Sequence, residues 1–243
     1  MRSNDGAVER EIPVVAGCSV RVSEGTRTPD RLDHNQELYQ LSYAHRVGLN
    51  LAAGRPRQVP CDHRRMSFDL GDPVPAFALR DTAGAEHAVP APNGEAPPAT
   101  VLVVTCNHCP YVVAWNPRLR AVAEDYAPRG VRVLAINAND ASRYPADSPQ
   151  AMERFVRDQG WPIPYLYDES QDVARALDAL VTPHVFVLDA DQRLRYRGAP
   201  DADHTDPGQN AQWLRDALDA VLDGSEPSPA DTRPRGCSVK WKA

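Results

Sequence analysis

The sequence predicts an α/β domain in which helices cover both faces of a central mixed β-sheet. Three observations support this fold class. Strand-like and helix-like segments alternate after residue 66, an order typical of such a sheet. Residues 100–105 form a continuous apolar run, the pattern of a strand buried on both faces. The chain has 243 residues and is 42% hydrophobic, which is enough for one core and short for two.

Residues 1–65 precede this pattern and show no persistent helical or strand periodicity. The first 17 residues mix acidic and basic side chains and lack the apolar stretch of a secretory signal. We expect 1–65 to be a disordered extension or the product of a mis-assigned start, with Met66 as the true first residue. The domain is then predicted to span 66–224, followed by a C-terminal tail, 225–243, that contains Cys237.

The first elements of the domain are a β-hairpin, a central strand and a helix. Strand-like segments at 68–70 and 77–80 are followed by a turn and a partner strand at 86–89, which predicts an N-terminal hairpin. After the apolar run, the residues of 107–126 have apolar positions spaced by about 3.6, as in a helix. Pro117 lies inside this helix and is expected to kink it or to end its first half.

A second helix carries clear boundary residues. Ser148 and Pro149 fit the N-cap and the first helical position, the helix should continue through Gln159, and Gly160 suits the C-cap. The other elements are predicted from the same kinds of pattern: strands at 131–136, 164–167, 184–188 and 193–197, and helices at 168–180 and 207–222.

The residues that carry chemistry are Cys106-Asn107-His108-Cys109, where the buried strand turns into the first helix. A thiolate is the nucleophile in disulfide exchange, and a helix N-terminus favours the charged form of Cys106. Cys109, one turn later, is expected to be more buried and less acidic, and near enough to resolve a mixed disulfide. His108, when protonated, would stabilise the Cys106 thiolate further, which predicts an oxidising pair.

The sequence resembles the thioredoxin superfamily, specifically the TlpA/ResA-like redoxins of the AhpC/TSA group. The resemblance covers about 68–222 and rests on three features: the Cys-x-x-Cys pair, the segment Val181–Pro183 with the strand after it, and the hairpin region 68–77. The ending 236–241 is also similar to endings in a bacterial redoxin subgroup with Cys-Asn-His-Cys-Pro-Tyr.

This resemblance implies a thioredoxin-like fold: a central mixed β-sheet flanked by helices, with an N-terminal β-hairpin extension. It also implies that Pro183 is cis and lies against the cysteine pair, where it keeps metal away from the thiols. Thr182 and Pro183 would then form the substrate-binding loop, because the backbone of Thr182 is available to pair with a substrate peptide.

Several positions depart from the family pattern. Thr105 stands where thioredoxins have a tryptophan before the first cysteine, and strand 100–105 lacks their buried carboxylate. The proton acceptor for Cys109 is therefore unassigned, with His184 as one candidate. The Pro-x-x-x-Thr-x-x-Cys pattern of peroxiredoxins is missing, because Ala99 and Val103 occupy those positions ahead of Cys106. This argues against a dedicated peroxidase.

These residues predict a thiol–disulfide oxidoreductase with Cys106 as nucleophile, Cys109 as resolving thiol and His108 as the tuning residue. Two alternatives stay open. One is a thiol-dependent, antioxidant peroxidase in which Cys106 becomes a sulfenic acid that Cys109 or Cys237 resolves. The other is a metal-binding or redox-sensing module, with His108, Cys237 and His184 as further ligands. Cys237 is treated as an accessory thiol on a flexible tail, or as a packed or exposed thiol with no redox role.

The predicted partners are a disulfide substrate, either a protein or a small thiol, and a thiol reductase that recycles the pair. No cofactor and no bound metal are expected. A net charge of −6 without a dense basic run argues against nucleic acid, and no window approaches 18 consecutive apolar residues, which argues against a membrane span. Without a recognisable signal, the chain is expected in the cytoplasm, where thiols are kept reduced.

Overall fold

The computed structural model describes residues 68–91 and 96–243. The interpretation of 1–65, including Met66 as the first residue, lies outside this described part of the chain, as do Cys18 and Cys61.

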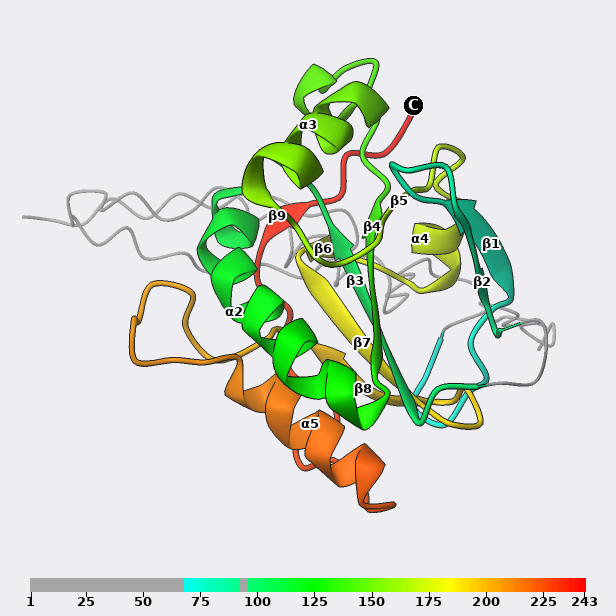
Figure 1. The fold of residues 1–243 in the computed structure, drawn as a ribbon, viewed down its shortest axis with the longest axis vertical. Coiled ribbons are helices and arrows are strands. Elements are labelled where there is room, and N and C mark those ends of the chain that lie inside the picture. The colour runs from blue at the N-terminus through cyan, green and yellow to red at the C-terminus, as the bar shows by residue number, and fades with distance from the viewer. Residues whose placement is uncertain (1–67, 92–95) are drawn as a thin grey trace, which may run out of the picture. The chain divides into compact units, whose positions relative to one another are not determined.

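A five-stranded sheet with the order β5-β4-β3-β7-β8 forms the centre of the fold (Figure 1). The strand β3 pairs in parallel with β4, which pairs in parallel with β5, whereas β3–β7 and β7–β8 are antiparallel. The sheet is therefore mixed, as the sequence predicts. Its strands are β3 (Ala99–Thr105), β4 (Arg132–Asn137), β5 (Tyr165–Tyr167), β7 (His184–Asp189) and β8 (Leu194–Gly198).

Helices pack against both faces of this sheet. The helices α2 (Pro110–Tyr126) and α5 (Gln212–Leu222) share one core cluster with β3 and β7, and α3 (Pro149–Gln159) packs on the same face beside β4 and β5. The opposite face is covered by α4 (Asp172–Ala176) and by the hairpin β1–β2. Figure 1 shows α2 and α5 lying together across the sheet. Because side chains alternate along a strand, the fully buried β3 supplies both clusters.

The N-terminal hairpin extension is present as predicted. The strands β1 (Phe77–Arg80) and β2 (Glu86–Val89) pair antiparallel, with Phe77 opposite Val89. The strand expected at 68–70 does not form. The chain contacts the sheet just after it, where Gly71 and Asp72 exchange backbone hydrogen bonds with Leu194 and Pro73 forms an isolated bridge to Arg193.

The boundaries of α3 agree with its capping residues. The Ser148 hydroxyl accepts a hydrogen bond from the Ala151 amide at 3.3 Å, and Gly160 adopts a left-handed conformation with φ 53° at the C-terminal end. The helix α2, in contrast, continues through Pro117 instead of ending there. The carbonyl that loses its helical donor at Pro117 belongs to Val113, which is 57% exposed, so water can satisfy it.

Two helices are shorter than predicted. The segment expected to be helical over 168–180 forms only α4, because Asp168 is buried outside the helix and accepts a hydrogen bond from the Ala174 amide. The last helix begins at Gln212 rather than 207, since the loop before it is tied by the Ala211 amide, which donates to Asp201 at 2.9 Å.

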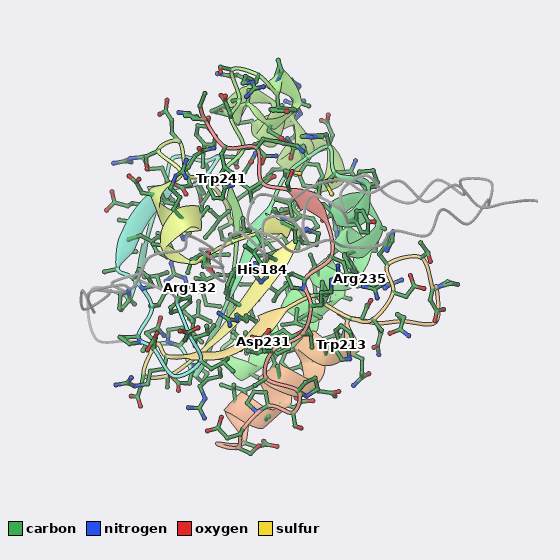
Figure 2. All side chains as sticks on the ribbon, turned by 180° about the vertical axis from the view of Figure 1, so that it is seen from behind. Arg132, His184, Trp213, Asp231, Arg235 and Trp241 are labelled. Atoms are coloured by element: carbon green, nitrogen blue, oxygen red, sulfur yellow. The ribbon has the colours of Figure 1, made fainter. Side chains whose placement is uncertain are left out.

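The C-terminal residues 225–243 are not the flexible tail that the sequence suggested. Cys237–Ser238 form β9, which pairs antiparallel with β6 (Val181–Thr182), directly before Pro183. Figure 2 shows this segment passing between Arg235 and Trp241 on the back of the domain. Within the described residues, none of the helices has the length and apolar character needed to cross a membrane.

Candidate active site

The cysteine pair lies at the turn from β3 into α2, where the sequence places it. Cys106 follows the last residue of β3, and Cys109 is the N-cap residue of α2, with Pro110 as the first helical residue. Both side chains are buried, with 2% of Cys106 and none of Cys109 exposed. The structure holds Cys106, Cys109 and Cys237 as thiols.

Thr182 contacts both sulfurs of the pair. Its hydroxyl lies 3.3 Å from Cys106 Sγ, and the Cys109 thiol donates to its carbonyl oxygen at 3.1 Å. The Thr182–Pro183 peptide is cis, as the family resemblance implies. The backbone of Thr182 is not open to a substrate strand, however, because β9 already pairs with it and Cys237 lies opposite Thr182 in the register.

The charge distribution between the two thiols is the reverse of the sequence expectation. The Cys106 and Cys237 thiols, together with the neighbouring amides of Val112 and Cys237, lower the pKa of Cys109. The hydrogen bond to Cys109, burial, and the nearby carboxylate of Asp147 raise the pKa of Cys106. The Thr182 carbonyl can only accept, so its contact with Cys109 belongs to the form in which both thiols keep their protons. When the pair loses its first proton, these pKa shifts favour the negative charge on Cys109 over Cys106.

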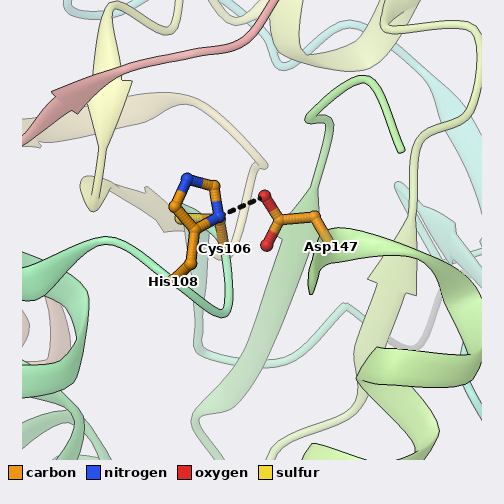
Figure 3. Close-up of side chains that lie close together, drawn as sticks. All are labelled: Cys106, His108 and Asp147. Atoms are coloured by element: carbon orange, nitrogen blue, oxygen red, sulfur yellow. Dashed lines mark ion pairs between the residues drawn. The ribbon is translucent and has the colours of Figure 1, made fainter. Parts of the chain in front are cut away.

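Asp147 is the residue of this site that sequence reasoning missed (Figure 3). Its fully buried carboxylate accepts hydrogen bonds from the Asn107 amide at 2.8 Å, from the Asn139 side chain at 2.7 Å, and forms an ion pair with His108 Nδ1 at 2.7 Å. In the sequence Asp147 stands 40 positions after Asn107, in what looks like an ordinary polar loop. No pattern in the sequence connects it with the cysteines.

His108 lies on the surface side of this carboxylate. Its side chain is 33% exposed, its ring stacks on Tyr144 with 5.8 Å between centroids, and Nδ1 faces Asp147. A carboxylate accepts hydrogen bonds only, so neutral His108 carries its proton on Nδ1 and leaves Nε2 unprotonated. His108 therefore influences Cys106 in company with Asp147, whereas the sequence suggested that it acts alone.

The sulfur of Cys106, a ring nitrogen of His108 and a carboxylate oxygen of Asp147 lie within 4.8 Å of one another. These side chain types can ligate metals, and this trio differs from the ligands suggested by the sequence. The Asp147 oxygens already accept the hydrogen bonds described above, and a metal would have to displace them. The contacts therefore fit a carboxylate that positions His108 and the turn better than they fit a metal ligand.

His184, the candidate proton acceptor for Cys109, is used elsewhere in the fold. Burial lowers the pKa of His184 to about 3. Its Nδ1 accepts a hydrogen bond from the Leu180 amide at 3.4 Å, and its ring packs on Phe186 with 4.3 Å between centroids. The group that receives the Cys109 thiol proton in a hydrogen bond is the Thr182 carbonyl.

Comparison with solved structures first defines the class of protein. The chain is similar to a putative thioredoxin from Neisseria meningitidis (22% identity, TM-score 0.50, 63% of this chain and 93% of that one). It is 42% identical to an uncharacterized conserved protein from Geobacillus kaustophilus (TM-score 0.66, 72% and 93%) and 35% identical to a hypothetical protein from Sinorhizobium meliloti 1021 (TM-score 0.68, 73% and 97%). The fold is thus thioredoxin-like.

The family follows from the sequence match. Residues 70–197 match the AhpC/TSA family, which is more than half of the chain, so the protein belongs to that family. None of the curated proteins gives a significant match. The thioredoxin-like fold and the redoxin group that the sequence suggested are confirmed.

Proposed function

We propose that this redoxin is a thiol–disulfide oxidoreductase in which Cys106 attacks a substrate disulfide and Cys109 resolves the mixed disulfide. The observation that carries the proposal is that two sulfurs at the N-terminus of α2 both contact one residue, Thr182 of β6. Membership of the AhpC/TSA family supports thiol oxidoreductase or peroxidase chemistry in general. Two adjacent thiols at the start of a helix suit the first of these.

The reaction starts from one shared proton. Once the reduced pair has lost its first proton, the Cys106 thiol donates the remaining proton to Cys109. Transfer of this proton makes Cys106 the thiolate, which attacks one sulfur of the substrate disulfide and expels the other as a thiolate. Cys109 then loses its proton to the departing thiolate and attacks Cys106. The Cys106–Cys109 disulfide forms and the bond to the substrate breaks. The second half of the substrate leaves as a thiolate, which takes a proton from water.

The His108–Asp147 pair sets how readily Cys106 accepts negative charge. The carboxylate of Asp147 opposes a thiolate on Cys106, whereas a protonated His108 offsets that carboxylate. The pair also fixes the turn, because the Asn107 amide donates to the same carboxylate. We assign His108 a tuning role and Asp147 a positioning role.

The substrates we propose are disulfides of proteins or of small thiols, and a thiol reductase would recycle the oxidised pair. A peptide that pairs with Thr182 must first displace β9, which holds that edge through only two residue pairs. A small disulfide needs less space. Both kinds of substrate require local opening, because Cys106 is 2% exposed.

The peroxidase alternative receives less support from the sequence. Both reactions need a Cys106 thiolate, so the raised pKa of Cys106 does not separate them. The peroxiredoxin pattern, however, is missing from the sequence before Cys106. Peroxide reduction is therefore tested beside disulfide exchange in the experiment that follows.

Oxidised glutathione and hydrogen peroxide are suitable probes for the full chain. We expect Cys109→Ser to accumulate one glutathione on Cys106, seen by intact mass and peptide mapping, because the mixed disulfide has no resolving thiol. Cys106→Ser should lose glutathione disulfide reduction, and Ser238→Ala serves as the matched control. The proposal fails if Cys109→Ser traps nothing while Cys106→Ser keeps the wild-type rate. If the chain reacts faster with hydrogen peroxide than with oxidised glutathione and forms a sulfenic acid on Cys106, the peroxidase is favoured.

A further inference from the structure

The third cysteine, Cys237, lies directly beside the redox pair. It packs against Cys106 and Cys109 in one small cluster, although it follows Cys109 by 128 positions. Register in the β6–β9 pair places it opposite Thr182, the residue that contacts both other sulfurs. Cys109 interacts with the thiol of Cys106 and with both the thiol and the amide of Cys237. Cys109 is thus the cysteine that interacts with both of the others.

Gly236 allows the backbone to come this close. A Cβ atom at this position would lie 2.1 Å from the carbonyl oxygen of Thr182 and 2.6 Å from its carbonyl carbon, distances that side chains do not tolerate. Any other residue would therefore push β9 away from β6. A glycine directly before Cys237 is a requirement of the arrangement that brings this cysteine to the pair.

The residues that follow Cys237 anchor the strand on the domain. The Lys240 amide donates to Asn139 Oδ1 at 2.8 Å, and the Lys242 amide donates to Gln171 Oε1 at 2.8 Å. Val239 is buried in the main core cluster. The position of Cys237 is therefore fixed on both sides, by Gly236 before it and by these contacts after it. This differs from a thiol on a mobile tail, which would reach the pair only by chance.

Accessibility differs among the three sulfurs. Cys106 is 2% exposed and Cys109 is fully buried, whereas Cys237 is of intermediate exposure. A disulfide between Cys106 and Cys109 is therefore shielded from an external thiol. A disulfide that includes Cys237 has one sulfur that such a thiol can reach with less opening of the fold.

We propose that Cys237 is a third redox-active cysteine, which takes over the disulfide from the buried pair by exchange at Cys109. This step rests on the proposed function, because it starts from the Cys106–Cys109 disulfide. The Cys237 thiolate attacks Cys109 Sγ, the Cys109–Cys237 bond forms, and the Cys106–Cys109 bond breaks. Its electron pair stays on Cys106, which takes up the proton that Cys237 gave up. One disulfide is kept throughout, so no further oxidant or reductant is needed.

The exchange has two consequences. It moves the disulfide toward the surface, where a reducing thiol attacks Cys237, and it returns Cys106 to the thiol form while the chain is still oxidised. Cys237 thereby takes part in the reduction of the oxidised pair and not in the first attack on the substrate. The sequence suggested that Cys237 might resolve an intermediate on Cys106, but the contacts make Cys109 its partner.

Disulfide mapping of the full chain tests this exchange. All variants carry Cys18→Ser and Cys61→Ser, so that the three thiols of the site are the only ones left. Each is reduced, treated with one equivalent of diamide, blocked with N-ethylmaleimide in acid and digested with trypsin without reduction. The peptide Gly236–Lys240 reports on Cys237, because cleavage after Arg235 and Lys240 releases it with a single cysteine.

We expect the wild-type sites to give both the Cys106–Cys109 disulfide and a cross-link to the Gly236–Lys240 peptide. Cys106→Ser should keep the cross-link, whereas Cys109→Ser should reduce it by about tenfold, because only Cys109 lies in position for exchange. Gly236→Val should weaken the cross-link and leave the Cys106–Cys109 disulfide intact. Gly208→Val, in an exposed loop, is the matched control.

A rate measurement adds a second readout. Cys237→Ser should slow reduction of the oxidised chain by glutathione by about fivefold or more, while Ser238→Ala should leave it unchanged. If the Cys106–Cys109 disulfide forms but Cys237 never joins a disulfide, the exchange is wrong and the proposed function stands. If no disulfide forms between Cys106 and Cys109 at all, the proposed function itself is wrong.

Discussion

Replacing Asp147 with asparagine should make the thiol of Cys106 more acidic. The buried carboxylate of Asp147 opposes a negative charge on the neighbouring sulfur, and it is among the causes that raise the pKa of Cys106. Asparagine has nearly the same shape and removes the charge. Its oxygen can still accept from the Asn107 amide, as the Asp147 oxygen does at 2.8 Å, so the turn before α2 keeps one of its anchors.

The size of the effect follows from the distance between the groups. The Cys106 sulfur and an Asp147 oxygen lie within 4.8 Å. At that distance two unit charges repel by roughly 3.5 kcal/mol at an effective dielectric constant of about 20, and by about 0.9 kcal/mol in bulk water. One pKa unit corresponds to about 1.4 kcal/mol. Because the screening at this site lies between these two limits, the pKa of Cys106 should fall by about 1 to 2.

The assay is the pH dependence of alkylation at Cys106, quantified by peptide mass spectrometry. A Cys109→Ser background removes the sulfur that shares its proton with Cys106. We expect the midpoint of the alkylation profile to move to lower pH in Asp147→Asn and to stay in place in Asp158→Asn, which alters an exposed carboxylate on α3. Circular dichroism verifies folding, because the Asn139 side chain loses an acceptor. An unchanged midpoint, or one at higher pH, in a folded variant would refute the reasoning.

Three further predictions concern charge in the domain. His108→Ala should lower the reduction potential of the pair, by roughly 30 mV for each 1.4 kcal/mol of lost thiolate stabilisation; redox titration measures this, and a rise would contradict it. Burial lowers the pKa of His184 from 6.5 to about 3, so the unfolded state alone takes up its proton below pH 6.5. Between pH 7 and 4.5, urea unfolding should show wild type losing roughly 2.5 kcal/mol more stability than His184→Gln; equal losses would contradict this. Arg118→Ala leaves the fully buried Asp201 without its cation and should destabilise the fold by about 3–5 kcal/mol in the same measurement; a loss below 1 kcal/mol would argue against a buried pair.

The parts of the fold that depend only on residues close together in the sequence could be predicted from it. Ser148 and Gly160 act through their own backbone and the next turn, and they mark the ends of α3 correctly. The continuous apolar run of β3 is likewise a property of one segment, and both faces of that strand are buried. Pro117 shows the limit of such reasoning, because the outcome depends on whether the carbonyl of Val113 faces solvent, which the sequence does not specify.

The electrostatics of the site depend on residues far away in the chain. The helix N-terminus argument favoured a thiolate on Cys106 because it counted only local donors. Asp147, brought in by the loop between β4 and α3, opposes that charge, and Cys237, brought in by β9, favours charge on Cys109 instead. The position of Asp147 is set by bonds to Asn107 and Asn139, which no spacing in the sequence indicates.

The central place of Cys109 among the three sulfurs explains why the most deeply buried thiol carries the charge. A buried thiolate is tolerated only where hydrogen bonds replace water, and Cys109 is the sulfur with the most donors around it. Two of those donors are the thiols of Cys106 and Cys237, which are also the groups with which Cys109 exchanges disulfides in our proposals. The same neighbours therefore stabilise the charge and are the partners that we propose. Cys106 lies beside Asp147, and Cys237 is more exposed than the pair, so the proposed substrate step and the proposed recycling step use different neighbours of Cys109.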